Sequence, residues 1–372
     1  MKINILHINA NYIYSQLHKC MVEKLDLKGN TSNKVFVATY NKKLGIVKTD
    51  SDVIVCECFN KWDRLFFDYK QRKILKAVEE NTDIRNFNCI HAYTLFTDGN
   101  CARNLSKKYN IPYVVAVRNT DVNSFFRIMK HLRKRGVKIM LDAKAVFFLS
   151  EAYLQEVLTK YVPKKYHDTI ISKTQIIPNG IDDFWLHNAP EDNKTIDKTG
   201  TINLIYAGRI DKNKNIPTIQ KAMEILSQKG YRFHLDVVGQ NQDDKEYKKI
   251  QADKNTTCLA PMAKEQLIDV YRKADIFIMP SFTESFGLVY AEAMSQGLPI
   301  IYSKGQGFDG QFAEGTVGFS VDAYSPESVA EGIEKLINNY DAIAMQVVEK
   351  AKKFNWTKLA GVYDEIYKDI MK

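Results

Sequence analysis

Short apolar runs alternate with longer amphipathic stretches along the whole chain, and this alternation is what most constrains the fold. The run Ile3–Ile8 has the length of a strand, and Arg64–Glu80 has the periodicity of an amphipathic helix. Strands that alternate with helices form βαβ units, in which helices cover both faces of a parallel sheet. The sequence therefore predicts an α/β protein with parallel sheets.

The same alternation occurs in both halves of the chain. In the first half, strands are expected at residues 3–8, 34–40, 53–59, 89–93, 113–117 and 146–150, and helices at 15–27 and 64–80. In the second half, strands are expected at 202–207, 233–238, 276–279 and 299–302, and helices at 216–229, 264–273, 286–295 and 326–338. Because 372 residues exceed the usual size of one core, we expect two doubly wound domains.

The first domain is predicted to comprise residues 1–178 and the second residues 179–354. A C-terminal helix at about 355–372 is expected to pack back on the first domain. The polar stretch His187–Gly200 is interpreted as a surface linker. Ligands of doubly wound sheets bind beyond the carboxyl ends of the strands, so the cleft between the domains is the expected site.

The net charge of +9 is concentrated in the first half of the chain. Residues 1–185 contain 30 Lys and Arg against 18 Asp and Glu, whereas residues 186–372 contain 23 against 26. This asymmetry favours an anionic partner for the first half, which can be a membrane surface, a phosphorylated acceptor or nucleic acid. The charge alone does not distinguish these three.

The sequence predicts a cytoplasmic protein, with peripheral binding at the inner face of the membrane as an extension of that prediction. It contains no apolar run of about 18 residues, and its N-terminus lacks the features of a signal peptide. Among six scattered cysteines, Cys56 and Cys58 form the only close pair, and a metal site would need a second one. We therefore expect reduced structural cysteines and no bound metal.

A strand followed by a turn and a helix carries two glutamates, Glu284 and Glu292. Eight helical residues span about 12 Å, which suits the two ends of an extended nucleotide sugar. A helix N-terminus between them would offer free N–H groups to a diphosphate, and Gly287 would allow close approach. Glu292 also lies among apolar neighbours, which is an unfavourable position for a charge without a role.

A second motif also leaves a strand and precedes a helix. It contains Gly208, Arg209 and, five residues after the arginine, Lys214. The planar guanidinium can bind two phosphate oxygens and the ammonium can add a point charge, so both can converge on one anion. A solvated loop is the alternative for this motif taken by itself.

The two motifs together resemble family 4 of the retaining glycosyltransferases, which have the GT-B fold of two Rossmann-like domains facing a cleft. The family signature of two glutamates separated by seven residues is matched by Glu284 and Glu292, and its Gly-Arg-…-Lys loop by Gly208, Arg209 and Lys214. Similar segments are Ile177–Asp182, Val237–Gly239, Ile90–Ala92 with Asp98-Gly99, and Phe354–Trp356. The resemblance covers most of the chain.

The resemblance implies a role for each matched residue. Arg209 and Lys214 would bind the donor diphosphate and stabilise the leaving group, which needs no metal. Glu284 would lie against the donor sugar and Glu292 would bind the ribose. The remaining expected donor contacts are Gly208, Gly239, Pro261, Met262, Ser285, Phe286, Gly287 and Leu288.

Two loops of the first half depart from the family pattern. The usual Gly-Gly turn after the first strand is replaced by bulkier residues that include Asn11 and Tyr12. The usual His-Gly-Ser/Thr-Asp loop reads Arg118-Asn119-Thr120-Asp121, with arginine in place of histidine. Arginine cannot act as a general base, so Arg118 either binds a carboxylate or phosphate of the substrate or pairs with Asp121. His91 is either a ligand contact or a buried structural histidine.

The segment Ser124–Arg135 is basic with interleaved aromatic residues. As a helix it would present a cationic amphipathic surface to an anionic bilayer or lipid phosphate, and an ordinary solvated helix is the alternative. We expect a transferase that moves a sugar from a UDP-sugar to a glycan or lipid-linked acceptor in cell-surface polysaccharide synthesis. The alternatives are an epimerase or phosphorylase of the same fold, or a non-catalytic nucleotide-binding protein; nucleic acid is disfavoured by the acidic second half.

Overall fold

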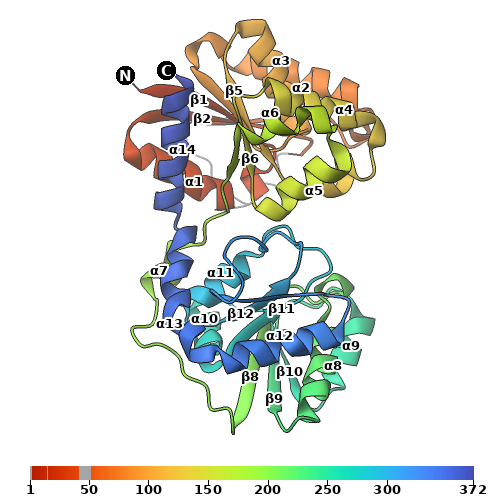
Figure 1. Ribbon diagram of the computed structural model, residues 1–372. Helices are drawn as coiled ribbons and strands as arrows, with labels where there is room; N and C mark the ends of the chain where they lie inside the picture. The colour runs from red at the N-terminus through yellow and green to blue at the C-terminus, as the bar shows by residue number, and fades with distance from the viewer. Residues whose placement is uncertain (1, 15, 42–51) are drawn as a thin grey trace. The chain divides into compact units, whose positions relative to one another are not determined.

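The computed structural model describes residues 2–14, 16–41 and 52–372. It contains two compact units (Figure 1). The first unit comprises Met1–Asn179 and Trp356–Lys372, and the second comprises Gly180–Asn355. The chain enters the second unit one residue after the predicted domain boundary, and its C-terminal helix belongs to the first unit.

The first unit is built on a parallel sheet of seven strands, in the order β3-β2-β1-β4-β5-β6-β7. The strands are β1 (Ile3–Ile8), β2 (Thr31–Thr39), β3 (Val53–Glu57), β4 (Cys89–Ala92), β5 (Tyr113–Val117), β6 (Ala145–Phe148) and β7 (Thr174–Ile176). The central strands are buried on both faces, as apolar parallel strands must be.

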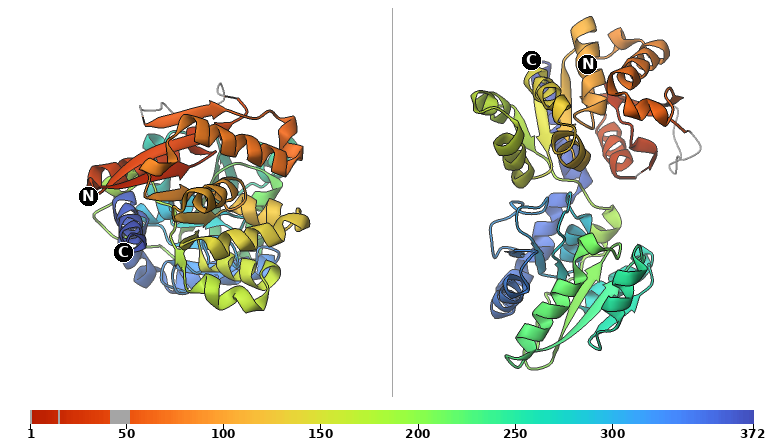
Figure 2. Two further views of the ribbon diagram at one scale, coloured as in Figure 1. Left: turned by 90° about the horizontal axis from the view of Figure 1, so that it is seen from above. Right: turned by 90° about the vertical axis from the view of Figure 1, so that its right-hand side faces the viewer.

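Helices cover both faces of this sheet and enclose two hydrophobic cores (Figures 1 and 2). One face is covered by α1 (Gln16–Lys28) and α14 (Trp356–Ile370). The other is covered by α2 (Phe67–Asn81), α3 (Thr97–Tyr109), α4 (Arg133–Asp142), α5 (Glu151–Tyr161) and α6 (His167–Ile171). The last helix of the chain thus completes a core that begins at the first strand.

The second unit repeats this design with a parallel sheet of six strands in the order β10-β9-β8-β11-β12-β13. The strands are β8 (Thr201–Ala207), β9 (Arg232–Val238), β10 (Thr256–Leu259), β11 (Ile276–Met279), β12 (Ile300–Ser303) and β13 (Gly318–Val321). The helices are α7 (Asp183–His187), α8 (Ile216–Ser227), α9 (Asp244–Gln251), α10 (Lys264–Lys273), α11 (Leu288–Ser295), α12 (Pro326–Asn338) and α13 (Tyr340–Ala351). The predicted fold class, two doubly wound parallel sheets, is confirmed.

Several predicted elements differ from the structure. Strands β7, β10 and β13 were not predicted, because they are short and two of them are only partly buried. The predicted helix at 64–80 is a 3₁₀ turn, Trp62–Leu65, followed by α2. Ser15, where another helix was predicted to begin, lies outside the described residues.

The stretch His187–Gly200 does not divide the two units, because it lies wholly within the second. Lys194 anchors it there by donating hydrogen bonds of 2.6 Å to the carbonyl oxygens of Arg272 and Ala274. None of the helices in the described ranges combines the length and hydropathy needed to cross a bilayer.

Tyr367 of α14 forms a polar contact that links the C-terminal helix to the sheet. Its hydroxyl lies 2.6 Å from Nδ1 of His91, which is fully buried in β4. We expect Tyr367→Phe to lower the unfolding free energy by about 1–3 kcal/mol, because a buried ring nitrogen loses its partner. Urea denaturation would measure this difference.

Tyr324→Phe is the matched control, since Tyr324 is 77% exposed. It should change the unfolding free energy by less than about 0.5 kcal/mol. Equal midpoints for Tyr367→Phe and the unmodified protein would show that the contact does not stabilise the fold.

Candidate functional site

The carboxyl ends of β8 and β9 lie so close together that only glycine fits there. A Cβ atom on Gly239 would lie 1.7 Å from the carbonyl oxygen of Gly208. Arg209 follows at the surface with an exposed side chain, and its carbonyl oxygen accepts a hydrogen bond of 2.5 Å from the Tyr206 hydroxyl. The two glycines therefore fix the backbone from which Arg209 projects.

Lys214 and Glu284, which the sequence assigned to two separate motifs, form an ion pair. The distance from Nζ to Oε2 is 2.6 Å, and each side chain is only 11% exposed. Lys214 ends a 3₁₀ turn, Lys212–Lys214, after β8, whereas Glu284 lies in the loop after β11. Because β8 and β11 are neighbours in the sheet, their carboxyl ends bring the two loops together.

Two asparagines hold these loops in place, and sequence reasoning missed both of them. Asn213 bonds Thr283 twice, through Nδ2 to its carbonyl oxygen at 2.8 Å and through Oδ1 to its amide at 3.0 Å. Asn215 adopts the left-handed conformation, with φ at 58°, and donates to the carbonyl oxygens of Pro280 and Ala323. Asparagine tolerates the left-handed conformation better than most residues, so an asparagine just before a predicted helix could have indicated this turn.

The loop after β12 forms the third side of the site and was also missed. Gln306 Oε1 accepts a hydrogen bond from the amide of Glu284, and the amide of Gly307 donates to the Glu284 carbonyl oxygen. A Cβ on Gly307 would lie 1.9 Å from the carbonyl oxygen of Ser285. Glycine after a strand end is too common a pattern to reveal this contact beforehand.

Glu284 is not on the helix that carries Glu292, so the two glutamates are not spaced by one helical span. Helix α11 begins at Leu288, after Gly287 in the left-handed conformation at φ 75°. No side chain caps this N-terminus, which leaves its first N–H groups available to an anion. Phe286 is 2% exposed, so its side chain belongs to the core rather than to the site.

Glu292 lies on α11 and is partly buried. Burial, and to a smaller extent the negative charge of Asp182, raise its pKa to about 7 against the opposing effect of the Lys264 ammonium. Asp182 and Lys264 are themselves an ion pair with a separation of 2.5 Å. Pro261 is exposed and Met262 half-buried in the loop that joins β10 to α10.

In the first unit, Arg118 lies at the carboxyl end of β5 among buried histidines. Its Nη1 donates to Asn179 Oδ1 at 3.2 Å, and its Nε is buried without a hydrogen-bond partner in the part of the chain that the structure describes. Burial lowers the pKa of His7 to about 4 and the pKa values of His18 and His91 well below 6.5. The three imidazoles are therefore neutral at pH 7.

Asp121 holds the main chain rather than the Arg118 guanidinium. Its carboxylate accepts hydrogen bonds from the amides of Leu95, Phe96 and Arg118 at 2.9–3.1 Å. Burial outweighs the opposing effects of these amides and of the Arg118 charge, so the pKa of Asp121 is raised to about 6. Asp121 is 1% exposed and thus serves the backbone of two loops.

The other tentative residues of the first unit lie in different surroundings. Tyr12 is 4% exposed and packs in a core, whereas Asn11 is exposed. Asn119 accepts a hydrogen bond from the side-chain amide of Asn123. His91 Nε2 is buried without a partner among the described residues, and its ring is stacked on Tyr93 at 4.3 Å. The structure therefore favours a structural role for Tyr12 and His91.

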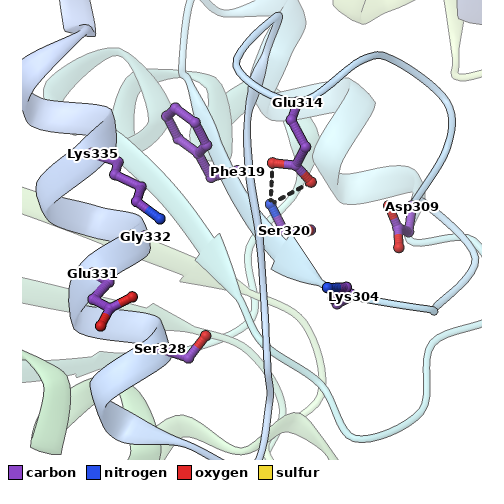
Figure 3. Close-up of a pocket in the computed structure, with 9 residues that line it drawn as sticks. All are labelled: Lys304, Asp309, Glu314, Phe319, Ser320, Ser328, Glu331, Gly332 and Lys335. Atoms are coloured by element: carbon purple, nitrogen blue, oxygen red, sulfur yellow. Dashed lines mark hydrogen bonds between the residues drawn. The ribbon is translucent and has the colours of Figure 1, made fainter.

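A cavity of about 300 Å³ elsewhere in the second unit contains none of the predicted site residues (Figure 3). It lies between β13, α12 and the loop after β12, and is lined by charges of both signs. The Glu314 carboxylate accepts a hydrogen bond from the backbone amide of Ser320, as Figure 3 shows. Within the described ranges, no three His, Cys, Asp or Glu side chains are grouped as metal ligands.

Known proteins share parts of this sequence and the whole of this fold. Residues 189–354 match the profile of the family described as "Glycosyl transferases group 1". A D-inositol 3-phosphate glycosyltransferase of Corynebacterium glutamicum is 30% identical over 177 residues, which are 44% of this chain and 42% of the relative. The chain therefore matches less than half of that relative's length.

Two solved structures show the extent of the likeness in fold. Sucrose-phosphate synthase of Thermosynechococcus elongatus superposes with a TM-score of 0.73 at 17% identity over 99% of both chains. HepE of Anabaena, solved with UDP and glucose, superposes with a TM-score of 0.66 at 16% identity, over 99% of this chain and 100% of the HepE chain. The two parallel-sheet units thus define the GT-B fold. The match of residues 189–354 to the model of the group 1 glycosyl transferases confirms the resemblance found in the motifs.

The raised pKa of Glu292 predicts a pH-dependent loss of stability. The folded-state pKa of about 7 exceeds the ordinary glutamate value of 4.5. The fold therefore loses stability as the pH rises from about 4.5 to about 7, the full cost is present above pH 7, and it is absent below about pH 4.5. Glu292→Gln should therefore raise the unfolding free energy by about 2–3 kcal/mol at pH 8, and by less than about 1 kcal/mol at pH 5.

Urea denaturation at the two pH values would measure these differences. Glu265→Gln is the control, because Glu265 is exposed on α10 and should show no such pH dependence. A constant difference between Glu292→Gln and the unmodified protein from pH 5 to pH 8 would contradict the raised pKa.

Proposed function

We propose that this protein is a glycosyltransferase that moves a sugar from a nucleotide-diphosphate donor to a glycan or lipid-linked acceptor, with retention at the anomeric carbon. A UDP-sugar is the proposed donor, and cell-surface polysaccharide synthesis the proposed setting. The observation that carries the proposal is the Lys214–Glu284 ion pair at the carboxyl edge of the second sheet, in the loop that leads to the uncapped N-terminus of α11.

Lys214 is proposed to stabilise the departing diphosphate. An ammonium has three N–H donors, and the bond to Glu284 leaves two for phosphate oxygens. Glu284 is thereby a positioning residue for Lys214, and its own backbone is fixed by Gln306 and Gly307. The exposed Arg209 guanidinium adds a planar fork to the same anion, and the first N–H groups of α11 add dipolar stabilisation.

The proposed reaction needs no enzymic nucleophile. The acceptor hydroxyl oxygen forms the new bond to the anomeric carbon on the face from which the diphosphate leaves. The bond to the phosphate oxygen breaks, and this oxygen takes the acceptor proton. Glu292 is proposed to accept hydrogen bonds from the ribose hydroxyls, a role for which its ionised form has free lone pairs. No metal is proposed for these steps.

Arg118 is proposed to bind an anionic group of the acceptor or of the transferred sugar. Its buried Nε has no hydrogen-bond partner in the described part of the chain, and the hydrogen bonds that the Asp121 carboxylate accepts come from backbone amides. Relatives of this chain are named for a phosphorylated cyclitol, which supports an anionic acceptor here. A guanidinium suits phosphate and carboxylate equally.

The role of Lys214 predicts a loss of turnover that exceeds the loss of binding. Lys214→Met should reduce the transfer rate from the accepted nucleotide sugar by about 10²–10³-fold, because a charge that stabilises the leaving group is removed. Nucleotide affinity, measured by calorimetry in EDTA, should fall by less. Lys229→Met is the control, since Lys229 forms an ion pair of the same length, 2.6 Å, with Glu334 away from the sheet edge.

The donor is first identified by thermal shift with UDP, GDP, ADP and their sugars in EDTA. A shift with UDP that Arg209→Ala abolishes supports the proposed donor, while a shift with GDP or ADP alone replaces it. Absence of a thermal shift with every nucleotide, or full turnover by Lys214→Met, would contradict the proposed function. A shift that requires added Mg²⁺ would remove its metal-independent part.

The buried Nε of Arg118, which has no hydrogen-bond partner among the described residues, predicts selectivity for charged acceptors. Inositol 3-phosphate should bind about 10–100-fold more tightly than inositol, and Arg118→Met should abolish this preference, as expected for a charge-assisted hydrogen bond. Arg103→Met is the control, because Arg103 already pairs with Asp142 at 2.6 Å. Binding of UDP-linked uronic acids and of neutral UDP-sugars to the same variants would test whether Arg118 binds the transferred sugar instead. If Arg118→Met changed neither the acceptor preference nor the donor preference, the proposed role of Arg118 would be contradicted.

A further inference from the structure

Two loops at the carboxyl edge of the first sheet expose large apolar side chains to solvent. After β3, the 3₁₀ turn and the residue that precedes α2 present Trp62, Leu65 and Phe66, which are 76%, 72% and 67% exposed. After β5, the chain presents Ile128, which is 71% exposed. Single exposed apolar side chains need no explanation, but several on one surface indicate a binding face.

The two loops form one continuous surface. The rings of Phe67 and Phe125 lie 5.9 Å apart, and the Arg135 guanidinium lies 5.1 Å from the Phe67 ring centre. Arg135 also forms an ion pair with Asp68, whose pKa is lowered further by the charge of His131. We call residues 59–73 and 124–135 together the apolar–basic surface.

This surface holds most of the excess positive charge of the protein. Its two segments contain ten Lys and Arg against two Asp, a net charge of +8 beside +9 for the whole chain. Both aspartates are already paired, Asp63 with Lys73 at 2.7 Å and Asp68 with Arg135. The exposed cations Lys61, Arg64, Arg72, Arg127, Lys130 and Lys134 thus surround the exposed apolar groups.

The segment Ser124–Arg135 is not the single amphipathic helix that its sequence allowed. It is divided between a π-helix, Asp121–Phe126, a 3₁₀ turn, Lys130–Leu132, and the start of α4. Phe126 turns into the core, while Ile128 points outward at the break between the two turns. The apolar contribution therefore comes mainly from the other loop, Trp62–Phe66, of which the sequence assigned only residues 64–66 to a helix.

We propose that the apolar–basic surface binds the anionic face of a lipid bilayer. Trp62, Leu65, Phe66 and Ile128 would enter the boundary between headgroups and acyl chains, and the surrounding cations would bind lipid phosphates. Charge by itself would suit any polyanion, but exposed leucine, isoleucine and phenylalanine gain nothing from a nucleic-acid backbone. This inference goes beyond the proposed transfer reaction and does not depend on it.

Flotation with phosphatidylcholine vesicles, with and without phosphatidylglycerol, tests the proposal on the full-length protein. The protein should float only with anionic vesicles, and added salt should weaken its binding. The combined variant Trp62→Ser, Leu65→Ser, Phe66→Ser should bind at least about 30-fold more weakly, because three large apolar side chains no longer leave water. Arg127→Gln with Lys130→Gln and Lys134→Gln should abolish the preference for phosphatidylglycerol.

The control is the combined variant Leu27→Ser, Tyr324→Ser, Met345→Ser, whose side chains are 79%, 77% and 67% exposed away from this surface. It should float like the unmodified protein. Absence of flotation with anionic vesicles would overturn the proposal, and so would unaltered binding by the Trp62 variant, which would indicate a polyanion site without lipid insertion. Equal losses in the control would also overturn it. Nucleotide thermal shifts report separately on the transfer site.

Discussion

The structure depends on one property of parallel sheets, namely that all their strands end at the same edge. Every loop that follows a strand in the second unit therefore opens on one side, and residues 70 positions apart in the chain, such as Lys214 and Glu284, are brought within 2.6 Å. The first unit uses the same property to gather Arg118, the histidines and the apolar–basic surface. The chemistry of each unit is thus confined to one edge.

At the edge of the second sheet, the charged residues are held by uncharged ones. Lys214 and Glu284 are nearly buried. The desolvation penalty of a buried ion pair offsets much of its electrostatic attraction, so the pair is favourable only when its geometry is fixed. Asn213, Asn215 and Gln306 supply that fixed geometry through hydrogen bonds to backbone groups of the neighbouring loops. Glu292, which lacks a comparable frame, shows the cost of burial as a raised pKa.

The fold was predictable because each strand and helix is indicated by a short stretch of sequence. Most contacts of the site were not predictable, because they join residues far apart in the chain. Buried strands such as β5 and β11 read as apolar runs, and charged motifs after strand ends indicated Lys214 and Glu284. The ion pair between them, the asparagine frame and the Gly307 contact depend on strand order, which local patterns do not encode. The same limit explains the mistaken position of Glu284, since the helix was predicted to begin at Phe286, two residues before α11, and the whole span from Glu284 to Glu292 was counted as helical.

The first unit is discontinuous in the chain, and this has a consequence for biosynthesis. Trp356, Leu359 and Tyr363 of α14 belong to the core around β1 and α1, yet they are synthesised after the whole of the second unit. Residues 180–355 form a compact unit that is complete before them. Domains usually fold in the order of their synthesis, but here the second unit can fold first, while the part of the first sheet that α14 covers stays exposed until α14 has been synthesised.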